Sequence, residues 1–179
     1  MNEQSFSLEP FPTASPKLDL TIAGNIARHS NTLAIGYTLT GEVGEIGIPP
    51  LADMPIRKNG LWEETCFEFF LGVKNSPRYW EFNLSPAGHW AVYSFADYRQ
   101  GMQEEMAFTS LSFTVQKEGD SLSLALELDL EKIVQATQAL LVGISAVIKH
   151  KDGDVTYWAL THAGSQADFH LRDTFRVEL

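Results

Sequence analysis

The feature of this sequence that most constrains its fold is the recurrence of apolar residues at every second position. The clearest case is the segment 121–129, where leucines alternate with small or polar residues, and the segment 32–40 repeats the pattern. A period of two is that of a β-strand, whose successive side chains point to opposite faces of a sheet. Roughly nine to eleven such segments, separated by turn residues, predict an all-β fold. We expect a two-sheet antiparallel β-sandwich of the jelly-roll or immunoglobulin-like type, with at most one short helix.

The segments follow one another without an internal repeat or a linker, which predicts a single domain over residues 1–179. Residues 1–16 contain three prolines, and we expect them to form an extended lead-in to a first strand at 17–22. The only segment with a helical pattern is 129–138, where Asp129 would be the N-cap.

The charge and the cysteine content narrow the classes of function. A formal net charge of -10 disfavours binding to nucleic acid, because phosphate recognition needs a basic patch, and disfavours an anionic membrane surface. Cys66 is the only cysteine, so no intramolecular disulfide can form. The N-terminal residues show no basic start followed by an apolar run, and no stretch approaches the ~18 apolar residues of a membrane span. These features predict a protein of a reducing compartment, the cytoplasm.

The segment 61–95 is the densest aromatic block of the chain and predicts three consecutive antiparallel strands. With the first turn at 74–77, Phe70 lies opposite Glu81 and Glu68 opposite Asn83. Because side chains alternate across a strand, one face of this pair carries core residues. That core face consists of Thr65, Phe67, Phe69, Leu71, Trp80, Phe82 and Leu84. The second face consists of Glu64, Cys66, Glu68, Phe70, Tyr79, Glu81, Asn83 and Ser85.

The second turn of the block, at 85–88, has proline at its second position and glycine at its fourth. A three-residue hairpin loop with Gly88 in the left-handed conformation would pair Glu81 with Tyr93 and place Trp90 in the core. A tighter two-residue loop would reverse the faces and turn Trp90 to the polar side. We favour the three-residue loop.

Two interpretations of the second face are open. It could be a solvated outer surface, which is the ordinary place for glutamates on a strand. It could instead line a pocket, because it combines carboxylates with aromatic rings and has no lysine within its strands. Carboxylates accept hydrogen bonds from hydroxyl groups, and flat aromatic rings cover the apolar C–H face of a sugar.

Two stretches of this block carry a resemblance to known proteins. Residues 61–70 read LWEETCFEFF, and residues 79–88 read YWEFNLSPAG. They resemble the family-9 carbohydrate-binding modules and the wider DOMON-like superfamily, which show a tryptophan–acid–acid strand followed by a Tyr…Glu-Phe-Asn…Ser-Pro-x-Gly hairpin. The length of the chain, with YWALTH at 157–162 and DFH at 168–170, resembles the stand-alone bacterial DOMON-like proteins.

The resemblance implies a two-sheet β-sandwich that binds a ligand without transforming it. Its relatives bind sugars, often between two tryptophans, or haem b through methionine and histidine. Trp62 matches the tryptophan before the acidic pair and is the first candidate for stacking on a sugar, although core packing is the alternative. Trp158 lies in the third of the chain where the resemblance places the second tryptophan. The alternative is that Trp158 belongs to the core.

We therefore expect a small-molecule ligand, in the first place a carbohydrate, with no cofactor and no metal. The expected ligand-binding residues are Trp62, Glu68, Glu81, Asn83, Arg57 and His170. Trp62 would stack on the ligand, the two glutamates and the asparagine would form hydrogen bonds, and Arg57 or His170 would lie at the rim. One alternative is a redox module that holds haem or a metal through His162 or His170, and another is a structural or protein-interaction domain.

Catalysis is less favoured than binding by the spacing of the acids and by the missing motifs. Glu64 and Glu68 would lie ~13 Å apart along one strand, beyond the reach of a glycosidase pair. Glu68 and Glu81 are diagonal neighbours with backbones ~7–8 Å apart, which leaves a hydrolase open. The chain has no nucleophile elbow, HExxH motif, phosphate-binding loop or dinucleotide-binding glycine pattern.

Overall fold

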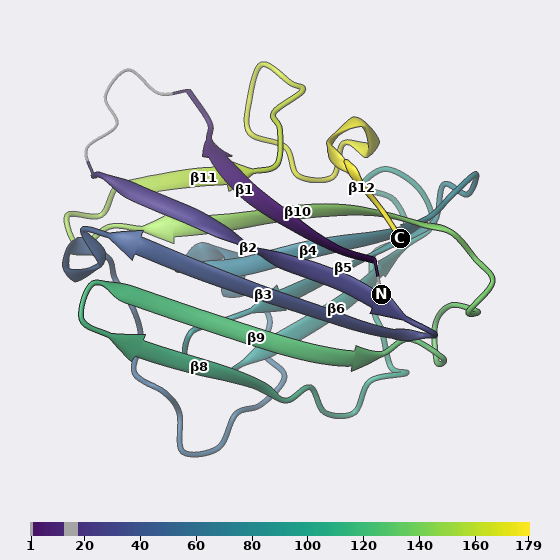
Figure 1. Ribbon diagram of the computed structural model, residues 1–179, viewed down its shortest axis with the longest axis horizontal. Helices are drawn as coiled ribbons and strands as arrows, with labels where there is room; N and C mark the ends of the chain where they lie inside the picture. Colours follow the sequence, from purple (N-terminus) through teal and green to yellow (C-terminus); the bar gives the residue numbers. More distant parts are fainter. Residues whose placement is uncertain (1, 13–17) are drawn as a thin grey trace.

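The computed structural model describes residues 2–12 and 18–179, and its regular secondary structure is almost entirely β-strand (Figure 1). The strands are β1 (Asn2–Pro10), β2 (Leu20–His29), β3 (Thr32–Gly41), β4 (Cys66–Val73), β5 (Tyr79–Leu84), β6 (Trp90–Phe95), β7 (Gln103–Glu104), β8 (Phe113–Glu118), β9 (Ser121–Asp129), β10 (Leu140–Lys149), β11 (Val155–Ala159) and β12 (Val177–Glu178). Three single-turn 3-10 helices are η1 (Val43–Glu45), η2 (Leu61–Glu63) and η3 (Arg172–Thr174). In the part of the chain that the structure describes, no helix is long and apolar enough to cross a membrane.

All strand pairings that the structure describes are antiparallel, and they form one continuous curled sheet in the order β7-β6-β5-β4-β10-β11-β1-β2-β3-β9-β8. Strand β12 pairs with β10 beside this path. We call β1, β2, β3, β9 and β8 the front half, and β11, β10, β12, β4, β5, β6 and β7 the back half. Figure 1 shows the two halves lying over one another.

The expected antiparallel all-β fold is confirmed, but its expected division into two separate sheets is not. Strand β1 pairs with β2 through residues 2–8 and with β11 through residues 9–10, so one strand joins both halves. The predicted lead-in is therefore a structural strand, although its residues 13–16 lie outside the described part. Prolines are tolerated there because Pro10 ends the strand, where its missing N–H removes no internal ladder bond.

The inward side chains of both halves form one inner core. The front half contributes Ile22, Ile26, Leu33, Ile35, Tyr37, Leu39, Leu122, Leu124 and Leu126, and the back half contributes Phe67, Phe69, Leu71, Trp80, Phe82, Trp90 and Val92. Phe69 stacks on Phe82 with ring centroids 4.4 Å apart. Tyr37 crosses the core, and its hydroxyl donates to the backbone carbonyl of Glu68 at 2.8 Å. This bond ties the front half to the strand that carries the acidic residues.

The helix predicted at 129–138 is wrong. Strand β9 continues through Asp129, and the following residues form irregular turns. Asp129 does cap a turn, because its Oδ1 accepts the N–H of Glu131 at 2.9 Å. The carbonyls that would extend a helix are bonded elsewhere: Asn31 donates to Val134 O, and Arg28 donates to Gln138 O. Side chains from the β2–β3 hairpin thus replace the intrahelical bonds.

Candidate functional site

The central strands of the back half, β4 and β5, are buried on both faces, unlike those of an ordinary sandwich layer. Every residue of β5, and every residue of β4 except Val73, is buried. The outer face is covered by η2, by the loop after β6 and by the segment 160–175. The side chains packed there form an outer cluster of Leu61, Cys66, Phe70, Tyr79, Ala91, Tyr93, Phe95 and Phe175, joined by Leu141 and Phe169. The interpretation of this face as a solvated surface is therefore wrong.

The predicted register of the three central strands is confirmed. Phe70 pairs with Glu81, Glu68 with Asn83, and Glu81 with Tyr93. The three-residue hairpin loop is also confirmed, because Gly88 has φ of +89° and Ser85 N–H donates to His89 O at 2.9 Å. This loop turns Trp90 into the inner core and leaves the acidic residues on the outer face.

A cavity of about 390 Å³ opens on this outer face. Its lining is Trp62, Glu68, Glu81, Phe95, Arg99, Met102, Val147, Tyr157, Ala167, Phe169 and His170. The strands β4, β5 and β10 supply Glu68, Glu81 and Val147 as the floor. Trp62 from η2 and Tyr157 from β11 are the partly exposed aromatic walls, at 40% and 42% exposure. Trp62 is held edge-on against Tyr93, with ring centroids 6.0 Å apart.

The two floor carboxylates are almost completely buried, with exposures of 3% for Glu68 and 5% for Glu81. Burial raises the pKa of Glu81 to about 7, although a hydrogen bond from Asn83 and the charge of Arg99 act in the opposite direction. Burial and the nearby charge of Glu81 raise the pKa of Glu68 well above its ordinary value. The pair therefore retains protons at a pH where exposed glutamates are ionised.

A second polar group stands on the cavity wall. His170 Nδ1 lies 2.8 Å from the hydroxyl of Tyr79, and its Nε2 lies 3.7 Å from Glu81 Oε2. Burial and the charge of Arg99 lower the pKa of His170 to about 4, so the imidazole is neutral near pH 7 and its contact with Glu81 is no ion pair there. Asp168 accepts from Arg99 at 2.8 Å and also accepts from the hydroxyl of Tyr98.

Four of the six predicted binding residues line one cavity: Trp62, Glu68, Glu81 and His170. Asn83 lies behind the floor, where its Nδ2 donates to Glu81 Oε1 at 3.0 Å, so it positions a carboxylate.

Arg57 does not lie at the rim of this cavity, and its predicted place is wrong. Its guanidinium covers the Trp90 ring at 4.4 Å and donates to the backbone carbonyls of Val92, Glu105 and Phe108. Arg57 follows an irregular segment whose path the sequence pattern does not indicate. It satisfies carbonyls of the strand β6 edge and of the loop before β8.

The second aromatic wall is Tyr157, which the sequence analysis missed in favour of its neighbour Trp158. Trp158 is buried in the inner core, and its Nε1 donates to Thr156 Oγ1 at 3.0 Å. Alternation along β11 could have separated the two, because adjacent residues face opposite sides. Arg99, Met102 and Phe169 were also missed, since they lie on irregular segments without a periodic signal.

The two histidines of the haem or metal alternative lie in different parts of the structure. His162 does not line the cavity; its Nε2 lies 2.9 Å from the carbonyl of Glu9 and its ring packs edge-on against Phe11. His170 lines the candidate cavity together with Met102 and the two floor carboxyl groups. Among the described residues, no group of three or more histidine, cysteine, aspartate or glutamate side chains could hold a metal ion.

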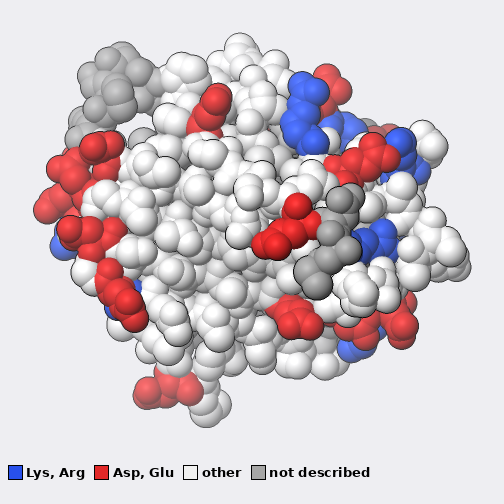
Figure 2. Space-filling model, in the orientation of Figure 1, with Lys and Arg blue, Asp and Glu red and all other residues white. Residues whose placement is uncertain are grey.

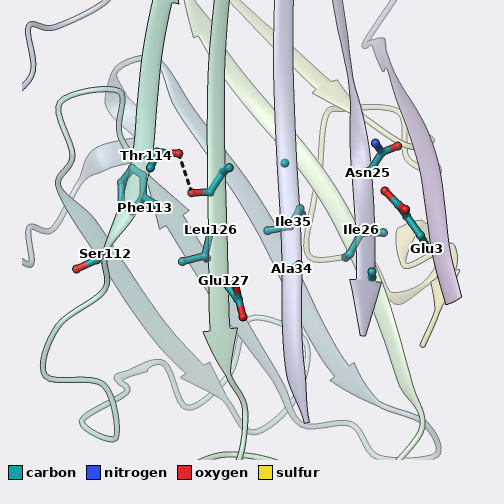
Figure 3. Close-up of a pocket in the computed structure, with 13 residues that line it drawn as sticks. Glu3, Asn25, Ile26, Ala34, Ile35, Ser112, Phe113, Thr114, Leu126 and Glu127 are labelled. Atoms are coloured by element: carbon teal, nitrogen blue, oxygen red, sulfur yellow. Dashed lines mark hydrogen bonds between the residues drawn. The ribbon is translucent and has the colours of Figure 1, made fainter. Parts of the chain in front are cut away.

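A second hollow, of about 600 Å³, lies on the outer face of the front half (Figure 3). Small side chains such as Ala34 and Thr114 line it, and its carboxylates, Glu3 and Glu127, are exposed. Figure 2 shows this side of the molecule as a broad uncharged area with acidic side chains around it. Among the described residues that line it, no polar side chain is buried. The cavity of the back half is therefore the better candidate site.

Comparisons with known proteins bear on the fold. No family model matches the sequence, and no curated protein matches it. A solved structure of a proposed carbohydrate-binding protein from Bacteroides uniformis has a TM-score of 0.73 at 13% identity, over 97% of this chain and 84% of that one. A family 9 carbohydrate-binding module from Caldicellulosiruptor kristjanssonii, in complex with glucose, has a TM-score of 0.50 at 9% identity, over 84% and 72%. The chain thus has a carbohydrate-binding-module-like fold.

Proposed function

We propose that this chain is a non-catalytic binding module that holds a carbohydrate, or a similar small polar ligand, in the cavity of the back half. The observation that carries the proposal is the lining of that cavity. Two partly exposed aromatic rings, Trp62 and Tyr157, lie on its walls, and two buried carboxylates, Glu68 and Glu81, lie on its floor.

The chemistry of a sugar matches this lining. A pyranose ring presents C–H groups on its faces, which pack against aromatic rings, and hydroxyl groups on its edge, which donate to carboxylates. Two structures with the same fold add support, since one is described as a proposed carbohydrate-binding protein and the other contains glucose. Membership of the DOMON-like superfamily and a cytoplasmic location stay predictions from the sequence.

The proposal is tested by isothermal titration calorimetry after a glycan array has selected a sugar. Trp62→Ala should weaken binding about five- to thirtyfold, because an aromatic wall contributes about 1–2 kcal/mol of stacking and burial. Trp62→Phe should retain much of the affinity. Met106→Ala is the matched control, since Met106 is 71% exposed and lies outside the cavity lining.

Two results would contradict the proposal. Undiminished binding by a Trp62→Ala/Tyr157→Ala double variant would move the ligand to another surface. Release of reducing ends from the bound glycan, abolished by Glu81→Gln, would make the protein a hydrolase.

A further inference from the structure

The balance of charge inside the cavity indicates more about the ligand than its polarity. The carboxyl, guanidinium and imidazole groups that line the cavity belong to Glu68, Glu81, Arg99 and His170. Arg99 is committed to Asp168, with its Nη2 2.8 Å from Oδ1. His170 is neutral near pH 7, so it supplies no countercharge. Within residues 2–12 and 18–179, neither floor carboxylate has an ion pair with a lysine or an arginine.

The hydrogen-bond partners of the floor carboxyl groups are neutral side chains, which are Ser145 and Cys66 for Glu68 and Asn83 for Glu81. Asn83 donates an amide N–H to Glu81, while its own Oδ1 is buried and accepts no hydrogen bond in the described part of the chain. Asn83 is on the same sheet face as both glutamates and directly opposite Glu68. Two carboxyl groups thus face the cavity, and an unsatisfied amide oxygen lies behind them. Such a group of acceptors is complemented by a ligand group that only donates.

A protonated amine has the required properties. It carries three N–H donors, no acceptor and the positive charge that the floor lacks. The walls add to this preference, because aromatic faces such as those of Trp62 and Tyr157 attract cations and also cover an apolar ring. A neutral hydroxyl would supply a single donor and no charge to the same floor.

We propose that the ligand is an amine-bearing sugar, bound with its ammonium group on the carboxylates of Glu68 and Glu81 and its ring against Trp62. This inference rests on the proposed function, and it adds the class of sugar. An N-acetylated or unmodified sugar of the same ring would leave the floor acceptors without a cation.

Binding of the amine must be linked to proton release. The empty pair retains protons because burial raises both pKa values, whereas an ammonium group beside the pair favours its ionised form. The other groups that face or surround the pair are Tyr37 from β3, Cys66 from β4, Tyr79 from β5, Tyr93 from β6, Arg99 after β6, and Asp168 and His170 from the segment 160–175. Their pKa values are displaced away from neutrality or stay outside it. Affinity for the amine should therefore rise as the pH approaches the Glu81 pKa of about 7, because the proton of that carboxyl group is then released more easily.

The test compares glucosamine, N-acetylglucosamine and glucose by isothermal titration calorimetry at pH 5.5 and pH 7. We expect glucosamine to bind at least about tenfold more tightly than the other two at pH 7, because hydrogen bonds to charged groups are the stronger ones. We expect that advantage to shrink at pH 5.5. Titrations in buffers of different ionisation enthalpy should show protons released by glucosamine and not by glucose.

The variants Glu68→Gln and Glu81→Gln test the contribution of the floor carboxylates separately from that of the aromatic walls. Each should remove most of the preference for glucosamine, measured as the ratio of the affinities for glucosamine and glucose. Equal binding of the three wild-type titrants would overturn the amine proposal while leaving the proposed function intact. Binding of none of the three, with no hit on an array that includes aminated glycans, would overturn both. If a variant fails to fold, the comparison of the three ligands and the proton release in the wild type still decide.

Discussion

The two halves of the sheet consist of the same kind of strand but differ in how many of their faces are buried. In the front half, β9 alternates strictly between buried and exposed or half-buried residues, and β3 nearly does so, as one-sided strands should. In the back half, β4 and β5 are buried throughout, with an inner core on one face and the outer cluster on the other. The strands β3 and β9 of the front half therefore bury one face, and the strands β4 and β5 of the back half bury two.

The difference shows where the molecule departs from what stability alone requires. The inner core already gives both halves an apolar surface to share. The outer face of the back half buries Glu68 and Glu81, and burying a carboxylate costs free energy unless a partner compensates. A site that retains such groups under loops is typical of binding or catalysis, where stability is exchanged for a prepared ligand contact.

The largest expected effect comes from the inner core, which the two halves share. Phe69→Ala should lower the free energy of unfolding by about 3–5 kcal/mol, because it leaves a cavity where Phe69 stacks on Phe82. Urea denaturation followed by tryptophan fluorescence measures the change. A loss below about 1 kcal/mol would show that the halves do not depend on a common core.

The floor carboxylates make a smaller contribution that depends on pH. The folded-state pKa of Glu81 is about 7 and lies above its unfolded value, so the wild type loses stability as the pH rises through 7. A shift of this size corresponds to about 3 kcal/mol between pH 4 and pH 9. Glu81→Gln should reduce this loss of stability and leave the part that comes from the raised pKa of Glu68, as measured by urea denaturation at several pH values. Glu127→Gln is the control, because Glu127 is exposed on the front half and should leave the wild-type pH profile in place.

A change in the cavity wall should mainly alter the pKa of His170. Burial and the charge of Arg99 lower the pKa of His170 to about 4, so removing that charge in Arg99→Ala should raise this pKa part of the way back. NMR titration of the imidazole protons measures it. Stability should fall by less than about 1 kcal/mol, because the Arg99 side chain is half exposed and solvent screens its pair with Asp168. An unchanged His170 pKa would mean that Arg99 does not act on the floor electrostatically.

The smallest effect is expected on the outer face of the front half. Thr38→Ala and Glu127→Gln replace exposed side chains there, and each should change the free energy of unfolding by no more than about 0.5 kcal/mol. Calorimetric titration with the selected sugar should give the wild-type affinity for both. Weakened binding would show that the hollow in Figure 3 takes part in the function.

The parts of the fold that the sequence predicted are those set by alternation. The pairing of Glu68 with Asn83 followed from the turn at 74–77 and a period of two, and the structure has that register. The segment 129–138 was mistaken for a helix because its pattern is local, whereas the bonds from Asn31 that shape it are not. Strand β1 was missed because three prolines obscure its pattern.

Alternation likewise predicted only part of the candidate site. Glu68 and Glu81 lie on adjacent strands of one hairpin, so their shared face was visible in the sequence. Arg99 and Asp168 are 69 residues apart and meet only because two irregular segments cover the sheet. No pattern in the sequence indicated that irregular segments cover this face. A strand that is buried on both faces can have the same sequence pattern as one with a solvated face.

The double pairing of β1 also affects how the chain is made. Its residues 2–8 can join β2 as soon as the first hairpin leaves the ribosome, but residues 9–10 wait for β11, about 150 residues later. The sheet therefore stays open along one seam during most of synthesis. An exposed strand end of this kind can pair with another chain, so slow translation before β11 should favour aggregation, and a chaperone that shields the N-terminal strand should oppose it.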